Sequence, residues 1–533
     1  MPIKVAAPLC PKCGTPMAKR HRKSDGNPFW GCSRFPNCRG IVSVGQEAHH
    51  QDVPQRLQFK FPPSEYQAEI IKFALEGEGN AVVVANAGCA KTTTNMMVGN
   101  AVGDFLGVAF NTHIAAEWAE KQPQAKIKTT HSFGLATIRR VFPEVKIDDR
   151  KIDKIIQPSI DAQPLEDEDK KSLRHVVMQM VNLARATLSW DFDWLADRYG
   201  IPINGDEELV YAITKFALEQ DMHMPKTVDF GDMLWLPHVL HLVPEKFPFI
   251  LADEYQDFNN AQNELILSAL APGGRIIAVG DPNQSLYGFR GADVDGIPNA
   301  IKRLRATTFP LPVCYRCPKE VIKVAQMFVP SIEAAPGAKD GSVEFLSETE
   351  ALKDVVAGDM ILCRTNAPLV APIYDLIRKG TKATIRGRDI GKGLIVLIEK
   401  FEPKSISLEE TLSKLHRYAE REIGKLMSRD RANQAEAIAD RVETIFALSE
   451  GCETVQGLKD KTASIFSDKV EGVVGSTVHR AKGLEADNVI IIRPDLMPHP
   501  MATKDWEVQQ EQNCMYVAAT RSKNRLVYAV KEG

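Results

Sequence analysis

The feature that most constrains the fold is a short β-branched run that leads directly into a glycine-containing loop and a lysine. The run AVVVA covers residues 81–85 and is followed by NAGCAKTT at residues 86–93. A strand, a tight loop and a helix start in this order can hold phosphate groups against backbone amides and the positive end of a helix. The predicted phosphate-binding residues are Ala85, Asn86, Ala87, Gly88, Cys89, Ala90, Lys91, Thr92 and Thr93.

This loop departs from the usual phosphate-loop pattern, in which Lys reaches the β- and γ-phosphates and a Thr hydroxyl binds Mg²⁺. The glycines expected at the first position and before the lysine are Ala85 and Ala90 here. Their Cβ atoms narrow the space for close phosphate approach. On this segment alone, an ordinary strand, turn and helix containing a lysine remains an alternative.

A second apolar run, FPFILA at residues 247–252, ends at two adjacent carboxylates, Asp253 and Glu254. A carboxylate at a strand end can hold magnesium, and its neighbour can orient or deprotonate an attacking water. A solvated acidic turn is the alternative interpretation. The position of the pair, at a strand end downstream of a phosphate loop, favours a catalytic and magnesium-binding role.

A third run, RIIAVG at residues 275–280, continues into a polar and aromatic segment. We expect Gln284 to place an amide near the γ-phosphate. Tyr287, Phe289 and Arg290 follow closely and would form a base-stacking surface. Such a surface could sense the nucleotide state.

The alternation of strands with helical segments predicts an α/β fold with buried parallel strands. At roughly 150 residues per domain, the 533-residue chain should hold three or four domains. A second strand series near Phe309 predicts a second core. The segments at about 140–235 and 395–470 have helical spacing and are interpreted as insertions. The predicted boundaries are 1–45, a linker at 46–59, 60–308 and 309–533.

The charge distribution predicts localised contacts with partners. The net charge is −3, but eight Lys and Arg against two acidic residues give the first 50 residues a charge of +6, so the remainder carries −9. A mildly acidic body does not exclude DNA binding. Because no uninterrupted stretch of about 18 apolar residues occurs and the N-terminus lacks a long apolar run, we expect an intracellular, cytoplasmic and nucleoid-associated protein.

Taken together, these segments resemble superfamily 1A helicases of the UvrD/Rep/PcrA type. The motifs follow one another in the order of that family from about residue 60 to the C-terminus. They read PSEYQAEI, the phosphate loop, AFNTHIAAEW, TTHSFG, DFGDML, ADEYQD, VGDPNQSLYGFRGA, LPVCYRCPKEVI, ILCRTNAPL, STVHRAKGLEADNV and EQNCMYVAATRSKNRL. The resemblance implies two RecA-like P-loop NTPase cores, 1A and 2A, with helical 1B and reduced 2B insertions.

The resemblance also implies an ATP site with Mg²⁺. In such a site Gln67 reads the adenine edge, Tyr315 stacks on the adenine ring, and Glu485 faces the nucleotide. Arg316 and Arg521 would approach the γ-phosphate from the second core, a role that suits the planar, permanently charged guanidinium.

For the nucleic acid, the resemblance implies contact with single-stranded DNA and with junctions between single- and double-stranded DNA. Stacking on aromatic side chains grips every base without sequence preference. The implied aromatic contacts are Phe110, Phe230, Tyr287 and Phe289, and the implied backbone contacts are Thr130, His131, Arg290, Arg364 and His479. Movement from 3′ to 5′ is likewise implied by the family.

The N-terminal cysteines predict a zinc ribbon. Cys10, Cys13, Cys32 and Cys38 form a four-thiolate set suited to tetrahedral Zn²⁺, although a disulfide framework is an alternative. The segment also resembles the C-terminal zinc ribbons of bacterial type IA topoisomerases, which bind single-stranded DNA. Its aromatic and basic residues, Phe29, Trp30, Phe35, Arg20, Arg22, Lys23, Arg34 and Arg39, suit that role.

Cys89, Cys314 and Cys317 are among the cysteines that lie inside the motifs. Cys314 and Cys317 have the spacing of a zinc or redox pair but lack a second pair, and they are interpreted as packing residues. Cys89 lies in the phosphate loop, where it could make ATP hydrolysis sensitive to thiol reagents.

Three functions stay open from the sequence. The first is a helicase that unwinds duplexes, and the second is a translocase without efficient unwinding, favoured by the short second insertion. The third is a nucleotide-gated DNA-binding sensor, favoured by Ala85 and Ala90.

Overall fold

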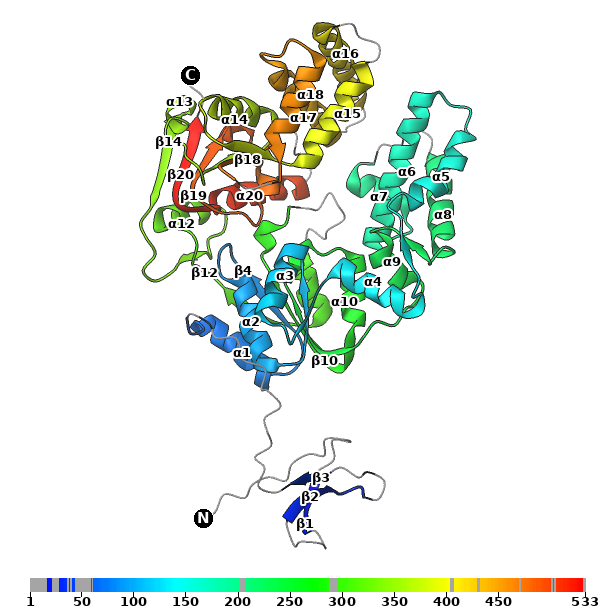
Figure 1. Cartoon of the computed structure of the whole chain (residues 1–533), viewed down its shortest axis with the longest axis vertical. Coiled ribbons are helices and arrows are strands. Elements are labelled where there is room, and N and C mark those ends of the chain that lie inside the picture. Colours follow the sequence, from blue (N-terminus) through cyan, green and yellow to red (C-terminus); the bar gives the residue numbers. More distant parts are fainter. Residues whose placement is uncertain are drawn as a thin grey trace. The chain divides into compact units, whose positions relative to one another are not determined.

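The computed structural model divides the chain into two compact units, Met1–Lys60 and Phe61–Gly533 (Figure 1). Each unit is described by itself. The structure describes residues 17–21, 28–35, 38, 41–43, 59, 61–201, 203, 207–286, 296–402, 407–428, 432–468, 471–499, 502 and 505–530. No helix within these ranges is long and apolar enough to cross a membrane.

The first core of the larger unit is a parallel sheet with strand order β11-β4-β10-β9-β5-β6. Its strands are β4 (Ala81–Ala85), β5 (Leu106–Ala109), β6 (Lys126–Thr129), β9 (Phe247–Ala252), β10 (Leu270–Gly280) and β11 (Thr307–Leu311). The apolar runs predicted from the sequence form the buried centre of this sheet, so the expectation of parallel α/β strands is confirmed. Because the strands are parallel, the residues that follow β4, β9 and β10 meet at one edge.

The last strand of this sheet crosses the predicted boundary at residue 308. All of β11, including Phe309 and Leu311, pairs with β4. The strand contains Pro310, which cannot donate a backbone hydrogen bond and is tolerated because β11 is an edge strand.

The second core is a parallel sheet with strand order β14-β20-β19-β15-β18-β16-β17. Its strands are β14 (Ser342–Ser347), β15 (Met360–Cys363), β16 (Ala383–Arg386), β17 (Phe466–Ser467), β18 (Val473–Thr477), β19 (Ala486–Ile492) and β20 (Ser522–Val530). The strands β14, β15, β19 and β20 overlap the apolar runs VEFL, MILC, NVIIIR and RLVYAV, which belong to the second strand series of the sequence. Two α/β cores are therefore present.

Helices fill both predicted insertions (Figure 1). The first contains α5 (Lys151–Asp161), α6 (Asp167–Thr187), α7 (Phe192–Tyr199) and α8 (Glu207–Met222), which share one apolar core. The second contains α15 (Arg388–Phe401), α16 (Leu408–Met427), α17 (Ala432–Ser449) and α18 (Val455–Ile465). It lies between β16 and β17 in the chain, so it is an insertion into the second core.

A buried group of charged residues joins the first insertion to the first core. The Arg185 guanidinium contacts Asp229 at 2.9 Å, Asp221 at 2.5 Å and Asp232 at 2.9 Å. Lys151 contacts Asp221 at 2.5 Å and Asp232 at 2.9 Å. Asp232 begins α9 (Asp232–Val239), in the DFGDML segment, so the charges connect α5, α6 and α8 to the motif that carries Phe230.

Replacing Arg185 by Met should lower the free energy of unfolding by about 3 kcal/mol or more, because three buried carboxylates would keep only one cation. Urea unfolding of the variant and the parent chain measures this change. Arg174→Met, on the same helix, is the matched control. Arg174 pairs with Asp153 at the surface, so its loss should cost less than about 1 kcal/mol. Equal losses in the two variants would contradict the structural importance of the buried group.

The smaller unit is a three-stranded antiparallel sheet in the order β1-β2-β3. Its strands are β1 (Met17–His21), β2 (Pro28–Cys32) and β3 (Ile41–Ser43). Cys32 and Met17 are buried at its centre, and Trp30 and Cys38 pack against them. The apolar core formed by the described residues of this sheet is small, as is typical of domains that depend on a metal or disulfides for stability.

Candidate functional site

The predicted phosphate loop connects β4 to α2 (Lys91–Val102). Gly88 has a φ of +65° and Ala90 a φ of 62°, both in the left-handed region. Ala90 precedes the helix and makes no side-chain cap. The amides at the start of α2 are therefore left without a side-chain acceptor from the capping position, which suits an anion.

The left-handed conformation of Ala90 predicts a stabilising substitution. A non-glycine residue in this region is strained by roughly 1–2 kcal/mol, so Ala90→Gly should raise the free energy of unfolding by about 1 kcal/mol. Ala85→Gly is the control, because Ala85 lies buried in β4, where glycine should cost about 0.5–1 kcal/mol. Urea midpoints of the two variants should move in opposite directions. A lower midpoint for Ala90→Gly would contradict the assigned backbone strain.

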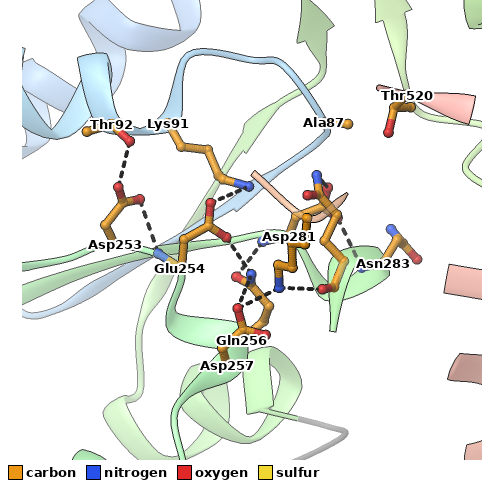
Figure 2. A network of polar contacts seen from close by, with 12 residues as sticks. Ala87, Lys91, Thr92, Asp253, Glu254, Gln256, Asp257, Asp281, Asn283 and Thr520 are labelled. Carbon is orange, nitrogen blue, oxygen red and sulfur yellow. Dashed lines mark hydrogen bonds and ion pairs between the residues drawn. The ribbon is translucent and has the colours of Figure 1, made fainter. Parts of the chain in front are cut away.

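The predicted carboxylate pair faces the phosphate loop (Figure 2). Lys91 Nζ lies 3.2 Å from Glu254 Oε1, and Thr92 Oγ1 donates to Asp253 Oδ2 at 2.7 Å. Burial disfavours the charged form of Lys91, but Glu254 and Asp281 outweigh it and raise the pKa of Lys91 above its ordinary value. The parallel sheet thus brings together residues about 160 positions apart in the chain.

The two carboxylates differ in their readiness to ionise. Burial and repulsion by Glu254 raise the pKa of Asp253 to about 6. Burial also opposes ionisation of Glu254, but Lys91 and Lys482 outweigh it and lower the pKa of Glu254 to about 2. A buried carboxylate beside the Thr92 hydroxyl provides the oxygen ligands that magnesium prefers, and the uptake of a cation would favour the ionised form of Asp253. Thr92 and Asp253 therefore fit a Mg²⁺ site.

A network of hydrogen-bonded polar residues also holds Glu254 in place. Gln256 Nε2 donates to Glu254 Oε2 at 2.5 Å, and the Asp281 amide donates to Gln256 Oε1 at 2.9 Å (Figure 2). Gln284 Nε2 donates to Asp281 Oδ2 at 2.7 Å. The predicted Gln284 therefore belongs to the same network and is linked to Lys91 through Asp281, Gln256 and Glu254.

The second core contacts the phosphate loop directly. The backbone N–H of Tyr315 donates to the Gly88 carbonyl at 2.9 Å, and a Cβ added to Gly88 would lie 2.8 Å from Arg316 Cβ. Arg316 Nε donates to Glu485 Oε2 at 2.6 Å. The predicted residues Tyr315, Arg316 and Glu485 are thus assembled at the junction of the two cores.

The other predicted arginine lies deeper. Arg521 is only 1% exposed and donates to the carbonyls of Val517 and Leu484. Burial and the neighbouring Arg316 lower the pKa of Arg521 to about 10. Its guanidinium is engaged by the second core itself, so reaching a γ-phosphate would require it to leave these carbonyls.

The two residues predicted to contact the adenine differ in solvent exposure. Gln67 is buried in α1 (Glu65–Glu76); its amide donates to Thr94 Oγ1 at 2.9 Å and accepts from the Ser64 backbone in a capping box. Tyr315 is 53% exposed, so its ring is free to stack. Of the two, only Tyr315 presents its recognition group to solvent.

Three residues predicted to contact DNA lie together on the first core. His131 and Phe230 meet edge to face with ring centroids 6.1 Å apart, and Phe230 is 58% exposed. Thr130, at the start of α4 (Thr130–Val141), is buried and accepts a hydrogen bond from Gln262. Burial lowers the pKa of His131, so its ring is neutral near pH 7 and would act as a hydrogen-bond partner. Phe110 follows β5 and is half-buried.

The predicted contacts on the second core surround α20 (Asp505–Ala519). Arg364 donates to both carboxylate oxygens of Glu511, with a shortest distance of 2.7 Å, and lies 3.4 Å from Glu436. His479 Nε2 lies 3.6 Å from Cys514 Sγ. Tyr287, Phe289 and Arg290 lie outside the described residues.

Two of the four predicted zinc ligands are described. The Arg34 backbone N–H donates to Cys32 Sγ at 3.4 Å, which favours a thiolate, and Cys38 packs in the same cluster. Cys10 and Cys13 lie outside the described residues, so they stay predictions. The donor chemistry at Cys32 fits a metal.

Two residues that were not predicted from the sequence, Tyr516 and Lys482, bridge the cores. The Tyr516 hydroxyl accepts the Ala87 backbone N–H at 2.8 Å. Lys482 Nζ donates to Asp257 Oδ2 at 2.5 Å and to the Gln284 carbonyl at 2.6 Å. Both lie within motifs recognised in the sequence, but only the fold reveals their partners.

Comparison with protein families matches three regions of the chain. Residues 109–305 match the UvrD/REP helicase N-terminal domain, and residues 399–533 match the UvrD-like helicase C-terminal domain. Residues 8–46 match the topoisomerase DNA-binding C4 zinc finger.

Curated relatives agree with these matches. DNA helicase II of Escherichia coli strain K12 is 32% identical over 150 residues, which is 26% of this chain and 20% of the relative. ATP-dependent DNA helicase PcrA of Staphylococcus aureus strain Mu50 is 26% identical over 286 residues, which is 49% of this chain and 38% of the relative. The chain thus spans about one fifth to two fifths of the length of the relatives that it matches.

Proposed function

We propose that this chain, which belongs to the UvrD-like helicases, hydrolyses ATP between its two cores and uses the cycle to move along single-stranded DNA. The observation that carries this proposal is the junction at Gly88, where Tyr315 and Arg316 of the second core meet the phosphate loop of the first. A nucleotide bound there would contact both cores. Hydrolysis would then change the contact between them.

The residues of the site supply the parts that phosphoryl transfer needs. Lys91 would hold the β- and γ-phosphates, and Thr92 with Asp253 would hold Mg²⁺, which neutralises phosphate charge when bound. Glu254, ionised down to low pH, would orient and deprotonate the attacking water. Arg316 would stabilise charge on the transferred group, with Arg521 behind it.

For the nucleic acid, Phe230 is better placed for stacking than Phe110, the other described candidate, because its ring is exposed and supported by His131. Arg364 is paired with Glu511 and Glu436, so it would bind a DNA phosphate only after breaking these ion pairs. We propose 3′ to 5′ movement and duplex unwinding at junctions, in an intracellular setting, as the function of the whole chain. Translocation without efficient unwinding is the second candidate, favoured by a second insertion of only α15 to α18 between β16 and β17.

The proposal is tested by ATP hydrolysis with and without single-stranded DNA. We expect DNA to stimulate turnover in the parent chain and Lys91→Ala to abolish it, because the lysine contacts the transferred phosphate. Lys121→Ala is the matched control, since Lys121 is an exposed residue paired with Glu117. Lack of stimulation by DNA, or unchanged turnover in Lys91→Ala, would contradict the proposal.

The ribbon leads to a separate prediction about metal content. We expect one zinc per chain in the purified protein, lost in Cys32→Ser and retained in Cys452→Ser, whose cysteine lies in the second insertion. Elemental analysis measures both. Zinc retained at full stoichiometry in Cys32→Ser would exclude Cys32 as a ligand.

A further inference from the structure

The cysteines of the CYRC segment lie where the second core meets the phosphate loop. Cys314 ends β12 (Val313–Cys314), and Cys317 follows in a bend before α12 (Lys319–Ala325). The Cys317 backbone N–H donates to Cys314 Sγ at 3.4 Å, so the Cys314 sulfur lies against the backbone of Cys317. Both cysteines are reduced in the structure. The two cysteines are therefore in contact within one bend.

The same segment touches the nucleotide machinery. A Cβ on Gly88 would lie 2.8 Å from Cys314 Sγ, and Cys317 Sγ lies 3.6 Å from the Thr520 carbonyl, which also accepts from Arg316. Tyr315 and Arg316 are the two residues between the cysteines. Drawing the two sulfur atoms together would therefore strain the short backbone segment that presents Arg316.

We propose that Cys314 and Cys317 form a modification site that hydroperoxides convert into a disulfide, and that this bond slows ATP turnover by displacing Arg316 from the phosphate loop. The effect of this bond on ATP turnover rests on the proposed function. A disulfide needs an S–S distance of about 2.05 Å, shorter than any hydrogen-bonded contact, so one sulfur must leave its present neighbours, Gly88 or the Thr520 carbonyl.

The chemistry is balanced with a hydroperoxide as the oxidant. The Cys314 thiolate attacks the O–O bond, forming a sulfenic acid and releasing water or an alcohol. Cys317 then attacks the Cys314 sulfur, the S–O bond breaks, and the hydroxide leaves as water with the Cys317 proton. Two thiols are oxidised to one disulfide while the peroxide bond is reduced.

The pKa of the thiol distinguishes Cys314 from Cys89, which lies nearby in the phosphate loop. The hydrogen bond from Cys317 lowers the pKa of Cys314 to about 6, so the attacking thiolate is present at neutral pH. Burial raises the pKa of Cys89 to about 12, which keeps that thiol protonated. Cys314 and Cys317 are buried, at 0% and 3% exposed, but Tyr315 between them is 53% exposed, so local motion of the bend would admit a small hydroperoxide.

The test uses the full chain treated with hydrogen peroxide. We expect the parent to lose the mass of two hydrogen atoms, to yield a peptide linked between Cys314 and Cys317, and to lose DNA-stimulated ATP turnover by about tenfold or more. Dithiothreitol should restore turnover. Cys452→Ser, the control, should behave as the parent does. Cys317→Ser, or Cys317→Ala if serine impairs folding, should form no link and keep its turnover in peroxide.

Several results would overturn the proposal. These are the absence of a link in the parent, a link that involves Cys89 instead, a linked chain with full turnover, and equal peroxide sensitivity in Cys317→Ser. If the untreated parent does not hydrolyse ATP, the proposed function fails, and peptide mapping alone still decides whether the dithiol is oxidised.

Discussion

Replacing Arg316 by Ala is expected to slow DNA-stimulated ATP turnover by about 10³- to 10⁵-fold, the effect of removing an arginine that stabilises a transferred phosphoryl group. The backbone N and the Cβ of Arg316 pack against the phosphate loop at Gly88, so the second core presents this guanidinium beside the loop. Its pairing with Glu485 at 2.6 Å holds it there before nucleotide binds. The measurement is steady-state ATP hydrolysis at saturating single-stranded DNA.

Two variants make this result specific. Arg378→Ala removes an exposed arginine of the second core, from α14 (Ala367–Arg378), and should leave turnover unchanged. Arg316→Lys should recover little, because a single ammonium cannot reproduce the planar fork of guanidinium donors. Turnover of Arg316→Ala close to that of the parent would show that Arg316 serves only the ion pair with Glu485.

The second large effect is expected for Glu254→Gln, which should lower turnover by about 10²- to 10⁴-fold while retaining nucleotide binding. The amide has nearly the same shape but cannot take a proton from water. The carboxylate is held in place by Lys91 at 3.2 Å and by Gln256 at 2.5 Å. Turnover and nucleotide affinity, measured on the same preparation, separate a chemical defect from a binding defect.

Glu264→Gln is the matched control for this substitution. Glu264 lies on α10 (Asn260–Ser268) of the same core and pairs with Arg303 at the surface. Its loss should change turnover little. If Glu254→Gln hydrolyses ATP as fast as Glu264→Gln does, Glu254 is not the general base.

The sequence predicted the two cores because buried parallel strands are continuous apolar runs. AVVVA, FPFILA and RIIAVG were recognisable for that reason, and they became β4, β9 and the end of β10. The pairing of Lys91 with Glu254 is seen only in the structure, where the parallel strands β4 and β9 end at one edge. The edge strand β11 was harder to place, because Thr307 to Leu311 includes a proline and is partly exposed.

Contacts across the junction of the cores could not be predicted. The Ala87 amide meets the Tyr516 hydroxyl, and Asp257 meets Lys482, across more than 200 residues of chain. No local pattern encodes such partners. The same limit applies to Arg364, whose motif suggested a phosphate contact but whose guanidinium is held by Glu511.

The left-handed backbone conformation of Ala90 could not be predicted from the sequence either. Alanine rarely adopts a positive φ, so its presence where a glycine is usual suggested only crowding near phosphate. In the structure, the alanine at this position instead strains the backbone. The Ala90→Gly substitution measures the free energy of that strain.

The proposed function is ATP-driven movement along single-stranded DNA. Its most direct test is the arrival time of the protein at a fluorophore on the 5′ end of single strands of increasing length, after ATP addition. We predict that the arrival time grows in proportion to strand length, and that the signal is absent without ATP and in Glu254→Gln. An arrival time independent of length, or a signal that persists without ATP, would contradict the account.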